Sequence, residues 1–272
     1  MMVNPGRSQG QNLGANQGQP PRAVHIPGQV QGSAGQGPGG PAQRPAVLFD
    51  LDGTLVDTAY LHTLAWWNAF RMQEYDIPMA AIHRCVGMTG SLLVDTLLPP
   101  GRDRDADSEI MASHSAVYAQ SWASLRPLDG AKELLAQCHA RGLAVVLASS
   151  ARKADLAAAR KALDADAFIH HATGPHDAKA SKPAPDILIA ALEAVGGSAS
   201  AAVYVGDAVW DMKAAVALGV PGIGVTCGGT GAAELREAGA TEVFDGPRDI
   251  LENLHHSAIG RLLALGPRTA GA

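Results

Sequence analysis

From Ala46 onward, short apolar runs alternate with Ala- and Leu-rich stretches of helical periodicity, and this alternation limits the possible folds more than any other feature of the chain. Alternating strands and helices are typical of βαβ units, in which helices cover a parallel sheet. The sequence predicts strands at 46–49, 143–148, 167–169, 202–205, 223–225 and 242–244, and helices at 130–141, 153–163, 185–195 and 211–218. We therefore expect an α/β protein with a parallel sheet at its centre.

Residues 58–125 break the alternation, because they show helical periodicity without a convincing strand. The first helix of this segment is predicted to carry a packing stripe, formed by Leu61, Leu64, Trp67 and Phe70. The segment directly follows the first strand and its turn. We therefore expect a small helical domain, residues 58–125, inserted into a core formed by residues 46–57 and 126–265.

The first 45 residues have a different composition from the rest of the chain. They contain 10 Gly, 8 Gln and 7 Pro, and their charged residues are three Arg. Such a segment cannot bury enough apolar surface to compensate for the entropy lost on ordering, so we expect it to be disordered. Two interpretations stay open: a solvated extension, or an interaction tail through which a non-catalytic scaffold protein would act.

The net charge of the chain is −5, and the part that follows the basic first 45 residues carries −8. An acidic folded region disfavours nucleic acid as the main partner, since binding of a phosphate backbone needs clustered Lys and Arg. A small anionic ligand would then be held by a few local groups. The sequence leaves the oligomeric state open.

Cysteine usage and hydropathy indicate in which cellular compartment the protein is expected. The close spacings of a zinc site or a disulfide framework do not occur among Cys85, Cys138 and Cys227, which we interpret as structural or incidental thiols. No apolar run approaches the ~20 residues of a membrane span, and the N-terminal region lacks the hydrophobic stretch of a secretory signal. We expect a cytosolic protein with no membrane partner.

Acidic residues gather where two of the predicted strands end. Asp50 and Asp52 lie two apart, so both side chains can lie on the same side of the chain. The two carboxylates repel each other unless a cation binds them, and Mg²⁺ takes oxygen ligands and commonly links carboxylates to a substrate phosphate. Asp207 and Asp211 follow another strand and can complete the site. The predicted Mg²⁺ ligands are thus Asp50, Asp52, Asp207 and Asp211.

A hydroxyl and an ammonium accompany these acids. Ser149 ends the strand at 143–148, and Lys182 stands in Ser-Lys-Pro-Ala-Pro-Asp. Both groups suit a phosphoryl group, because phosphoryl transfer depends mainly on positioning and charge neutralisation. A carboxylate can be the nucleophile. Ser150 is the alternative phosphate ligand, since neighbouring residues of a strand point to opposite faces.

Taken in order, Asp50-Leu-Asp-Gly-Thr-Leu, Ser149, Lys182 and Gly206-Asp207-xxx-Asp211 resemble the four motifs of the haloacid dehalogenase superfamily. The resemblance spans roughly residues 46–245, and the ordered set is far more specific than any single motif. It implies a doubly wound Rossmann-like core with a helical cap inserted after the first motif. The similarity is to the branch that contains phosphoglycolate phosphatases and β-phosphoglucomutases.

The same resemblance implies roles for individual residues. Asp50 attacks phosphorus, and Asp52 protonates the leaving alcohol and then activates water. Mg²⁺ is bound by Asp50, Asp207 and the backbone carbonyl of Asp52, with Asp211 as a nearby or water-mediated contact. The phosphoryl oxygens are held by Ser149 and Lys182, and Lys182 also steadies the nucleophile.

The helical insertion contributes further candidates. His62 and Trp66 lie four apart and can share a helical face. The position of His62 after Asp50 resembles that of a His that assists the acid/base in the β-phosphoglucomutase branch. However, the turn 86–90, which includes Gly87 and Gly90, lacks the Arg that this branch places just after its comparable Gly. Simpler interpretations are core packing for His62 and Trp66, a surface cation for Arg84, and helix N-capping for Asp57 and Asp211.

These observations favour Mg²⁺-dependent hydrolysis of a small phosphomonoester through an aspartyl-phosphate. A sugar phosphomutase is the alternative that His62 motivates. A dehalogenase is disfavoured, because displacement of halide needs neither the second Asp nor the metal set. Phosphonate cleavage would need a Lys in the insertion, and residues 58–125 contain none. The sequence leaves the identity of the phosphorylated metabolite open.

Overall fold

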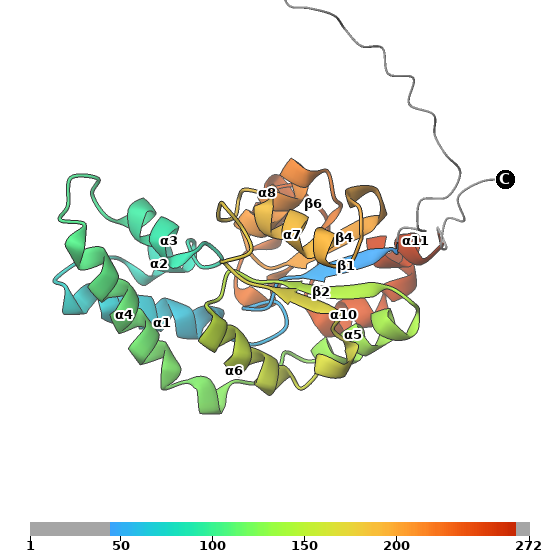
Figure 1. Ribbon diagram of the computed structural model, residues 1–272, viewed down its shortest axis with the longest axis horizontal. Coiled ribbons are helices and arrows are strands. Elements are labelled where there is room, and N and C mark those ends of the chain that lie inside the picture. The colour runs from blue at the N-terminus through green and yellow to red at the C-terminus, as the bar shows by residue number, and fades with distance from the viewer. Residues whose placement is uncertain (1–43, 265–272) are drawn as a thin grey trace, which may run out of the picture. The chain divides into compact units, whose positions relative to one another are not determined.

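The computed structural model describes residues 44–264, so the predicted disorder of the first 45 residues lies almost wholly outside it (Figure 1). Six parallel strands form one sheet in the order β3-β2-β1-β4-β5-β6. Their bounds are β1 Ala46–Phe49, β2 Ala144–Ala148, β3 His171–Thr173, β4 Ala202–Gly206, β5 Gly222–Val225 and β6 Ala240–Phe244. The predicted doubly wound α/β fold is confirmed.

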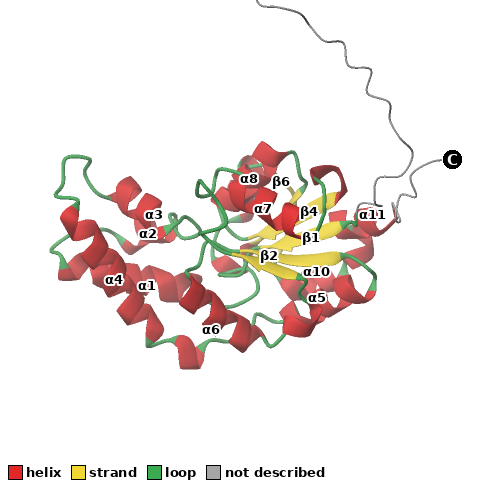
Figure 2. Cartoon of the chain, in the orientation of Figure 1, coloured by secondary structure: helices red, strands yellow, loops and turns green. Residues whose placement is uncertain are grey.

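Helices cover both faces of this sheet, as Figures 1 and 2 show. One face packs against α5 Ala131–Ala140, α6 Lys153–Leu163, α10 Pro247–Glu252 and α11 Ala258–Ala264, and the other against α7 Asp186–Ala194 and α8 Val209–Leu218. A short helix, α9 Ala232–Glu237, contacts β5 and β6. Successive side chains of β1 alternate between the two hydrophobic clusters, with Val47 in one and Leu48 in the other. Burial on both faces explains why this strand reads as a continuous apolar run.

One predicted strand was wrong. Residues Asp166–Phe168 form a 3₁₀ turn, and the strand that pairs with β2 is β3, at His171–Thr173. The side chain of Phe168 packs against the core from the turn, which gave the segment its apolar character. Strand β3 shows no apolar run, because His171 is exposed and Ala172 is half-buried, so that Thr173 alone of its three residues is buried.

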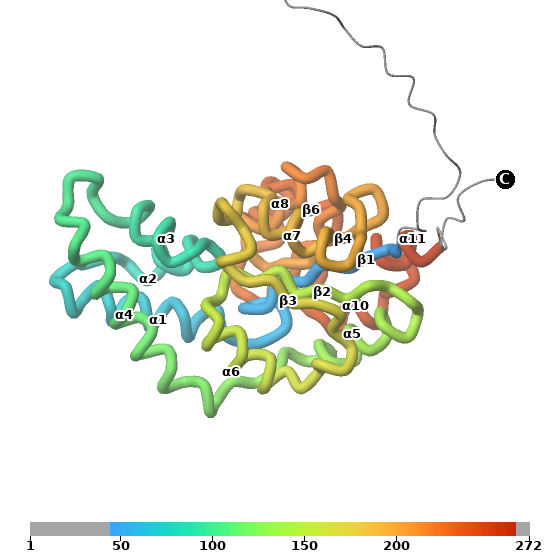
Figure 3. Tube along the Cα trace, viewed as in Figure 1, coloured from blue at the N-terminus to red at the C-terminus, as the bar shows by residue number. Residues whose placement is uncertain are grey.

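Four helices lie between β1 and α5, at α1 Ala59–Met72, α2 Met79–His83, α3 Gly90–Leu97 and α4 Asp105–Ala119. They share a hydrophobic cluster of their own, centred on Trp66, Phe70 and Ile110. Helices α1 and α4 run side by side (Figure 3). The predicted packing stripe was partly wrong, because Leu64 is 45% exposed whereas Trp66 is buried. The exact limits of the inserted domain, 58–125, remain a prediction.

Candidate active site

Asp50 and Asp207 lie where the strand order reverses. The neighbouring strands β1 and β4 lead to opposite ends of the sheet, and ligands of open α/β sheets bind at such a switch point. Asp50 directly follows β1, and Asp207 directly follows β4. The Asp50 backbone N–H donates to the carbonyl of Val205 at 2.8 Å, which fixes the two strand ends against each other.

Lys182 links two carboxylates from different parts of the chain. Its buried Nζ lies 2.7 Å from Asp50 Oδ1 and 2.8 Å from Asp211 Oδ1. The Tyr204 hydroxyl donates to Asp211 Oδ1 at 2.7 Å, and the Ala208 backbone N–H donates to Oδ2 at 3.0 Å. Both oxygens of Asp211 are therefore occupied by protein donors. Its contact with Ala208, the residue before α8, matches the helix-capping interpretation.

The charges at this site do not balance. Burial raises the pKa of Asp50 to about 7, although Lys182 opposes the effect and Asp211 adds to it. Burial, together with Asp211 and Asp50, also raises the pKa of Asp207 well above its usual range. Burial disfavours the Lys182 ammonium, but Asp211 and Asp50 outweigh this and raise the pKa of Lys182. Three buried acids thus share one Lys, whose charged form Asp211 and Asp50 favour.

The acids fit a divalent cation. Asp50, Asp207 and Asp211 each place a carboxylate oxygen within 4.8 Å of the others, and all three are buried. An all-oxygen donor set with excess negative charge is the kind that Mg²⁺ occupies. Asp207 Oδ1 accepts a hydrogen bond from Thr54 at 3.0 Å. A Cβ on Gly228 would lie 1.8 Å from Asp207 Oδ2, so this position admits only glycine.

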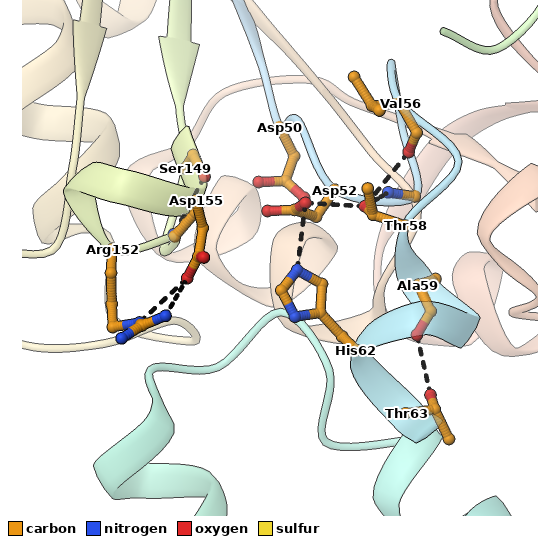
Figure 4. A network of polar contacts seen from close by, with 12 residues as sticks. Asp50, Asp52, Val56, Thr58, Ala59, His62, Thr63, Ser149, Arg152 and Asp155 are labelled. Atoms are coloured by element: carbon orange, nitrogen blue, oxygen red, sulfur yellow. Dashed lines mark hydrogen bonds and ion pairs between the residues drawn. The ribbon is translucent and has the colours of Figure 1, made fainter. Parts of the chain in front are cut away.

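Asp52 is not a member of the group formed by Asp50, Asp207 and Asp211, and Figure 4 shows its carboxylate in contact with Thr58 and His62. Its Oδ1 accepts from the Thr58 hydroxyl at 2.7 Å and lies 3.3 Å from His62 Nε2. Burial would raise the pKa of Asp52, but the charge of His62 and the hydrogen bonds from His62 and Thr58 lower it. Asp52 is therefore a carboxylate held between two donors, and it lines the same cavity as Asp50.

Other predicted residues have mixed outcomes. The interpretation of Asp57 as an N-cap was wrong, because Thr58 occupies that position at α1 and Asp57 is exposed. Arg84 is an exposed cation that contacts Glu234 at 3.4 Å. Ser149 is fully buried, and its Oγ accepts from the Ala151 backbone N–H at 3.0 Å.

A cavity of about 240 Å³ lies between the insertion and the carboxyl ends of the strands. Its lining includes Asp50, Asp52, Ser150, Arg152 and Asp155 from the core and His62, Trp66, Gly87, Gly90 and His114 from the insertion. The Arg152 guanidinium donates to Asp155 Oδ2 through Nε at 3.0 Å and Nη2 at 2.7 Å (Figure 4). The structure thus brings Ser150 and the predicted His62 into one cavity with Asp50, whereas the fully buried Ser149 does not belong to the lining.

Sequence reasoning missed two residues next to His62. His114 Nε2 lies 3.2 Å from His62 Nδ1, and the ring of Tyr118 stacks on His62 at 3.8 Å between centroids. His114 also stacks on Trp66 at 4.0 Å. Both missed residues belong to α4 and lie four apart, as His62 and Trp66 do on α1. The sequence signal that could have revealed His114 and Tyr118 is this equal spacing of two aromatic pairs on two predicted helical segments.

No helix among residues 44–264 is both long and apolar enough to cross a lipid bilayer.

Comparisons with known proteins agree with this geometry. The family model of haloacid dehalogenase-like hydrolases matches residues 45–219. A phosphoglycolate phosphatase of Rhodospirillum rubrum is 33% identical over 215 residues, which cover 74% of this chain and 86% of that protein. A β-phosphoglucomutase of Bacillus subtilis is 30% identical over 190 residues, which cover 66% and 82%.

A solved structure shows the same architecture. The crystal structure of a hydrolase from Pseudomonas syringae superposes with a TM-score of 0.76 at 31% sequence identity. The alignment covers 79% of this chain and all of that one. The family prediction and the prediction of an enzyme are therefore confirmed: the chain belongs to the haloacid dehalogenase-like hydrolases.

Proposed function

We propose that this protein is a Mg²⁺-dependent phosphatase, which hydrolyses a small phosphomonoester through a phosphorylated Asp50. The observation that carries the proposal is the contact between Asp50 and Lys182 inside a buried cluster of carboxylates that opens on a cavity. Lys182 Nζ lies 2.7 Å from Asp50 Oδ1, which leaves Oδ2 as the oxygen able to attack. The relatives named as phosphoglycolate phosphatases support the same reaction class.

The cation and the Lys have complementary parts in this proposal. Asp50 and Asp207 would hold Mg²⁺, with the Asp52 backbone carbonyl as the further expected ligand, and Asp211 would act mainly by holding Lys182. When bound, the cation neutralises negative charge on the transferring phosphoryl group. Lys182 and Ser149 would stabilise the other phosphoryl oxygens while an Asp50 oxygen forms its bond to phosphorus and the bond to the leaving oxygen breaks.

Asp52 would transfer the protons in both half-reactions. Its carboxylate contacts His62 Nε2 at 3.3 Å, so a proton given by His62 can pass through Asp52 to the leaving alcohol. In the second half-reaction Asp52 takes a proton from water, which attacks the phosphorus of phospho-Asp50 and releases inorganic phosphate. The hydrogen bonds that keep Asp52 ionised favour this role as a base.

The size of the cavity favours a small substrate. Its volume of about 240 Å³ is below the roughly 300–1,000 Å³ typical of sites for drug-sized ligands. We propose that the helical insertion acts as a cap, which excludes bulk water from the cavity during transfer. The cytosolic location remains the prediction made from the sequence.

A sugar phosphomutase is the second candidate, and the contact between His62 and Asp52 favours it. The 30% identical relative named β-phosphoglucomutase points in the same direction. Against it, the segment 86–90 lines the cavity without any cationic side chain. The two reactions differ only in whether water or a substrate hydroxyl receives the phosphoryl group from Asp50.

The test is Mg²⁺-dependent release of phosphate from a panel of small phosphomonoesters, with Asp50→Asn as the comparison and an isomerisation assay on glucose 1-phosphate. We expect release by the wild type and none by Asp50→Asn. Isomerisation without net release would make the mutase the better assignment. Failure of the pure wild type in both assays would contradict the proposal.

The two neighbouring serines allow a matched test of the phosphate site. Ser149→Ala is expected to lower kcat/KM by about 10²–10³, the cost of one donor to a developing oxyanion. Ser150→Ala removes a hydroxyl of the same size from the cavity wall, and we expect a loss of less than about tenfold. Steady-state kinetics on the best substrate of the panel measure both. The opposite order would assign the phosphate contact to Ser150.

A further inference from the structure

Four aromatic rings from two helices form a continuous stack beside Asp52, in the loop that follows β1. His62 and Trp66 come from α1, and His114 and Tyr118 come from α4. Ring centroids are 3.8 Å apart for Tyr118 and His62, 5.4 Å for His62 and His114, and 4.0 Å for His114 and Trp66. Both histidines are buried, with exposed fractions of 8% for His62 and 6% for His114.

Both ring nitrogens of His62 have a polar partner. Nε2 lies 3.3 Å from Asp52 Oδ1, and Nδ1 lies 3.2 Å from His114 Nε2. An ionised carboxylate can only accept, so Nε2 of His62 carries the hydrogen in the contact with Asp52. The orientation of His62 is therefore fixed from both edges of the ring.

Stacking alone cannot select this orientation. A half-turn of the His62 ring about its Cβ–Cγ bond exchanges nitrogen and carbon positions but leaves the ring plane on Tyr118 unchanged. The same half-turn removes Nδ1 from His114 and Nε2 from Asp52. The hydrogen bond to His114 is thus the contact within the stack that distinguishes the two orientations.

The surroundings make His114 a suitable partner. Burial, His62 and Arg152 lower the pKa of His114 to about 2, so its ring is neutral. A neutral imidazole can present Nε2 either as donor or as acceptor, according to its tautomer. His114 can therefore stay bonded to His62 Nδ1 whether or not that nitrogen carries a hydrogen.

We propose that His114 is a positioning residue, which holds the His62 ring so that Nε2 faces Asp52 during turnover. The inference rests on the proposed phosphatase and adds to it a residue of the cavity lining that acts through His62. In this arrangement His114 plays the role of the third residue of a catalytic triad. That residue orients the imidazole ring that transfers the proton.

The experiment compares two substitutions at position 114. His114→Gln places an amide at about the reach of Nε2, whereas His114→Phe keeps a flat ring against Trp66 and removes the hydrogen bond. We expect His114→Phe to lower kcat by about 10–100-fold with little change in KM, the usual effect of losing an orienting partner. His114→Gln should recover most of this loss. Thermal melts show whether either variant folds less well.

A double-mutant cycle with His62→Ala separates positioning from packing. Once His62 is absent, His114→Phe should have almost no further effect on kcat, because the two residues act as one unit. Full additivity, or a kcat of His114→Phe equal to that of the wild type, would overturn the proposal. Equal losses in His114→Phe and His114→Gln would do the same.

A second measurement does not depend on activity. In ¹⁵N-labelled wild-type protein, the two ring nitrogens of His62 should have the distinct shifts of a single fixed arrangement, and His114→Phe should change them while His114→Gln preserves them. If the wild type releases no phosphate, the proposed function fails and this spectrum still decides the role of His114. Unchanged His62 shifts in His114→Phe would overturn the inference even in an active enzyme.

Discussion

Asp50→Asn is expected to abolish phosphate release and, in metal-free buffer at pH 8, to make the protein more stable than the wild type. Burial raises the pKa of Asp50 from 3.8 to about 7, so the folded protein keeps a proton that the unfolded chain releases above about pH 4. Stability is then lost as pH rises from about 4 to 7, and the full cost is present above pH 7. Asn carries no charge and avoids this cost.

The expected gain is on the order of a few kcal/mol, since each unit of pKa shift corresponds to about 1.4 kcal/mol. Urea unfolding with EDTA at pH 5 and pH 8 measures it, and the difference between Asp50→Asn and wild type should be much smaller at pH 5. Asp57→Asn is the matched control, because Asp57 is exposed in the same loop. That substitution should change stability by less than about 0.5 kcal/mol.

Mg²⁺ should reverse the order of stability. A cation that binds the folded state stabilises it by mass action, and its binding here requires Asp50 to be ionised. We therefore expect Mg²⁺ to raise the Tm of the wild type more at pH 8 than at pH 5, and to raise that of Asp50→Asn far less. If Asp50→Asn were less stable than the wild type at pH 8 without metal, the contact with Lys182 would outweigh the burial cost and the charge argument would be wrong.

Lys182→Met is expected to inactivate the protein and to destabilise it by roughly 3–5 kcal/mol, the usual cost of removing one partner from a buried ion pair. The ammonium is fully buried between Asp50 and Asp211 and contacts the face of Tyr204 at 5.5 Å. Met has a similar length and fills the space, so packing changes little. The lost charge leaves the neighbouring carboxylates uncompensated.

Urea unfolding at pH 8 and phosphate release on the best substrate measure the two effects of Lys182→Met. Lys179→Met is the control, since Lys179 lies three residues earlier in the same segment and is exposed. It should leave stability and activity close to those of the wild type. A Lys182→Met protein of wild-type stability at pH 8 would contradict the geometry described for the buried cluster.

Much of the fold and the outline of the site could be predicted from local sequence features. Strand β1 reads as a continuous apolar run because both of its faces are buried, and Asp50 follows it without a gap. The order of the motifs places Asp50 and Asp207 at the ends of strands, and a parallel sheet brings such ends to one edge. Periodicity and chain order carry this information, so a single sequence contains it.

Sequence analysis failed where an element lacks a strong pattern. Strand β3 was misplaced by a few residues, because two of its three side chains are not buried and the nearby turn at 166–168 contains Phe168. Likewise, the N-cap position of α1 is Thr58 rather than Asp57, and the Thr58 hydroxyl donates to Asp52 instead of capping the helix. Neighbouring polar residues compete for one position, and tertiary contacts decide which of them occupies it.

The sequence by itself determined the fold class and the family, and it predicted Asp50, Asp52, Lys182 and Asp207 as site residues, because each stands in a short motif and three of them follow the end of a strand. Only the tertiary structure decided that both carboxylate oxygens of Asp211 accept hydrogen bonds from the protein, and that His62 lies between Asp52 and His114. Tyr204 and Ala208 are close to Asp211 in the chain, whereas His114 lies on another helix, 52 residues from His62. Their contacts depend on how helices rotate and pack against each other, and that geometry is set by the whole core rather than by any local pattern.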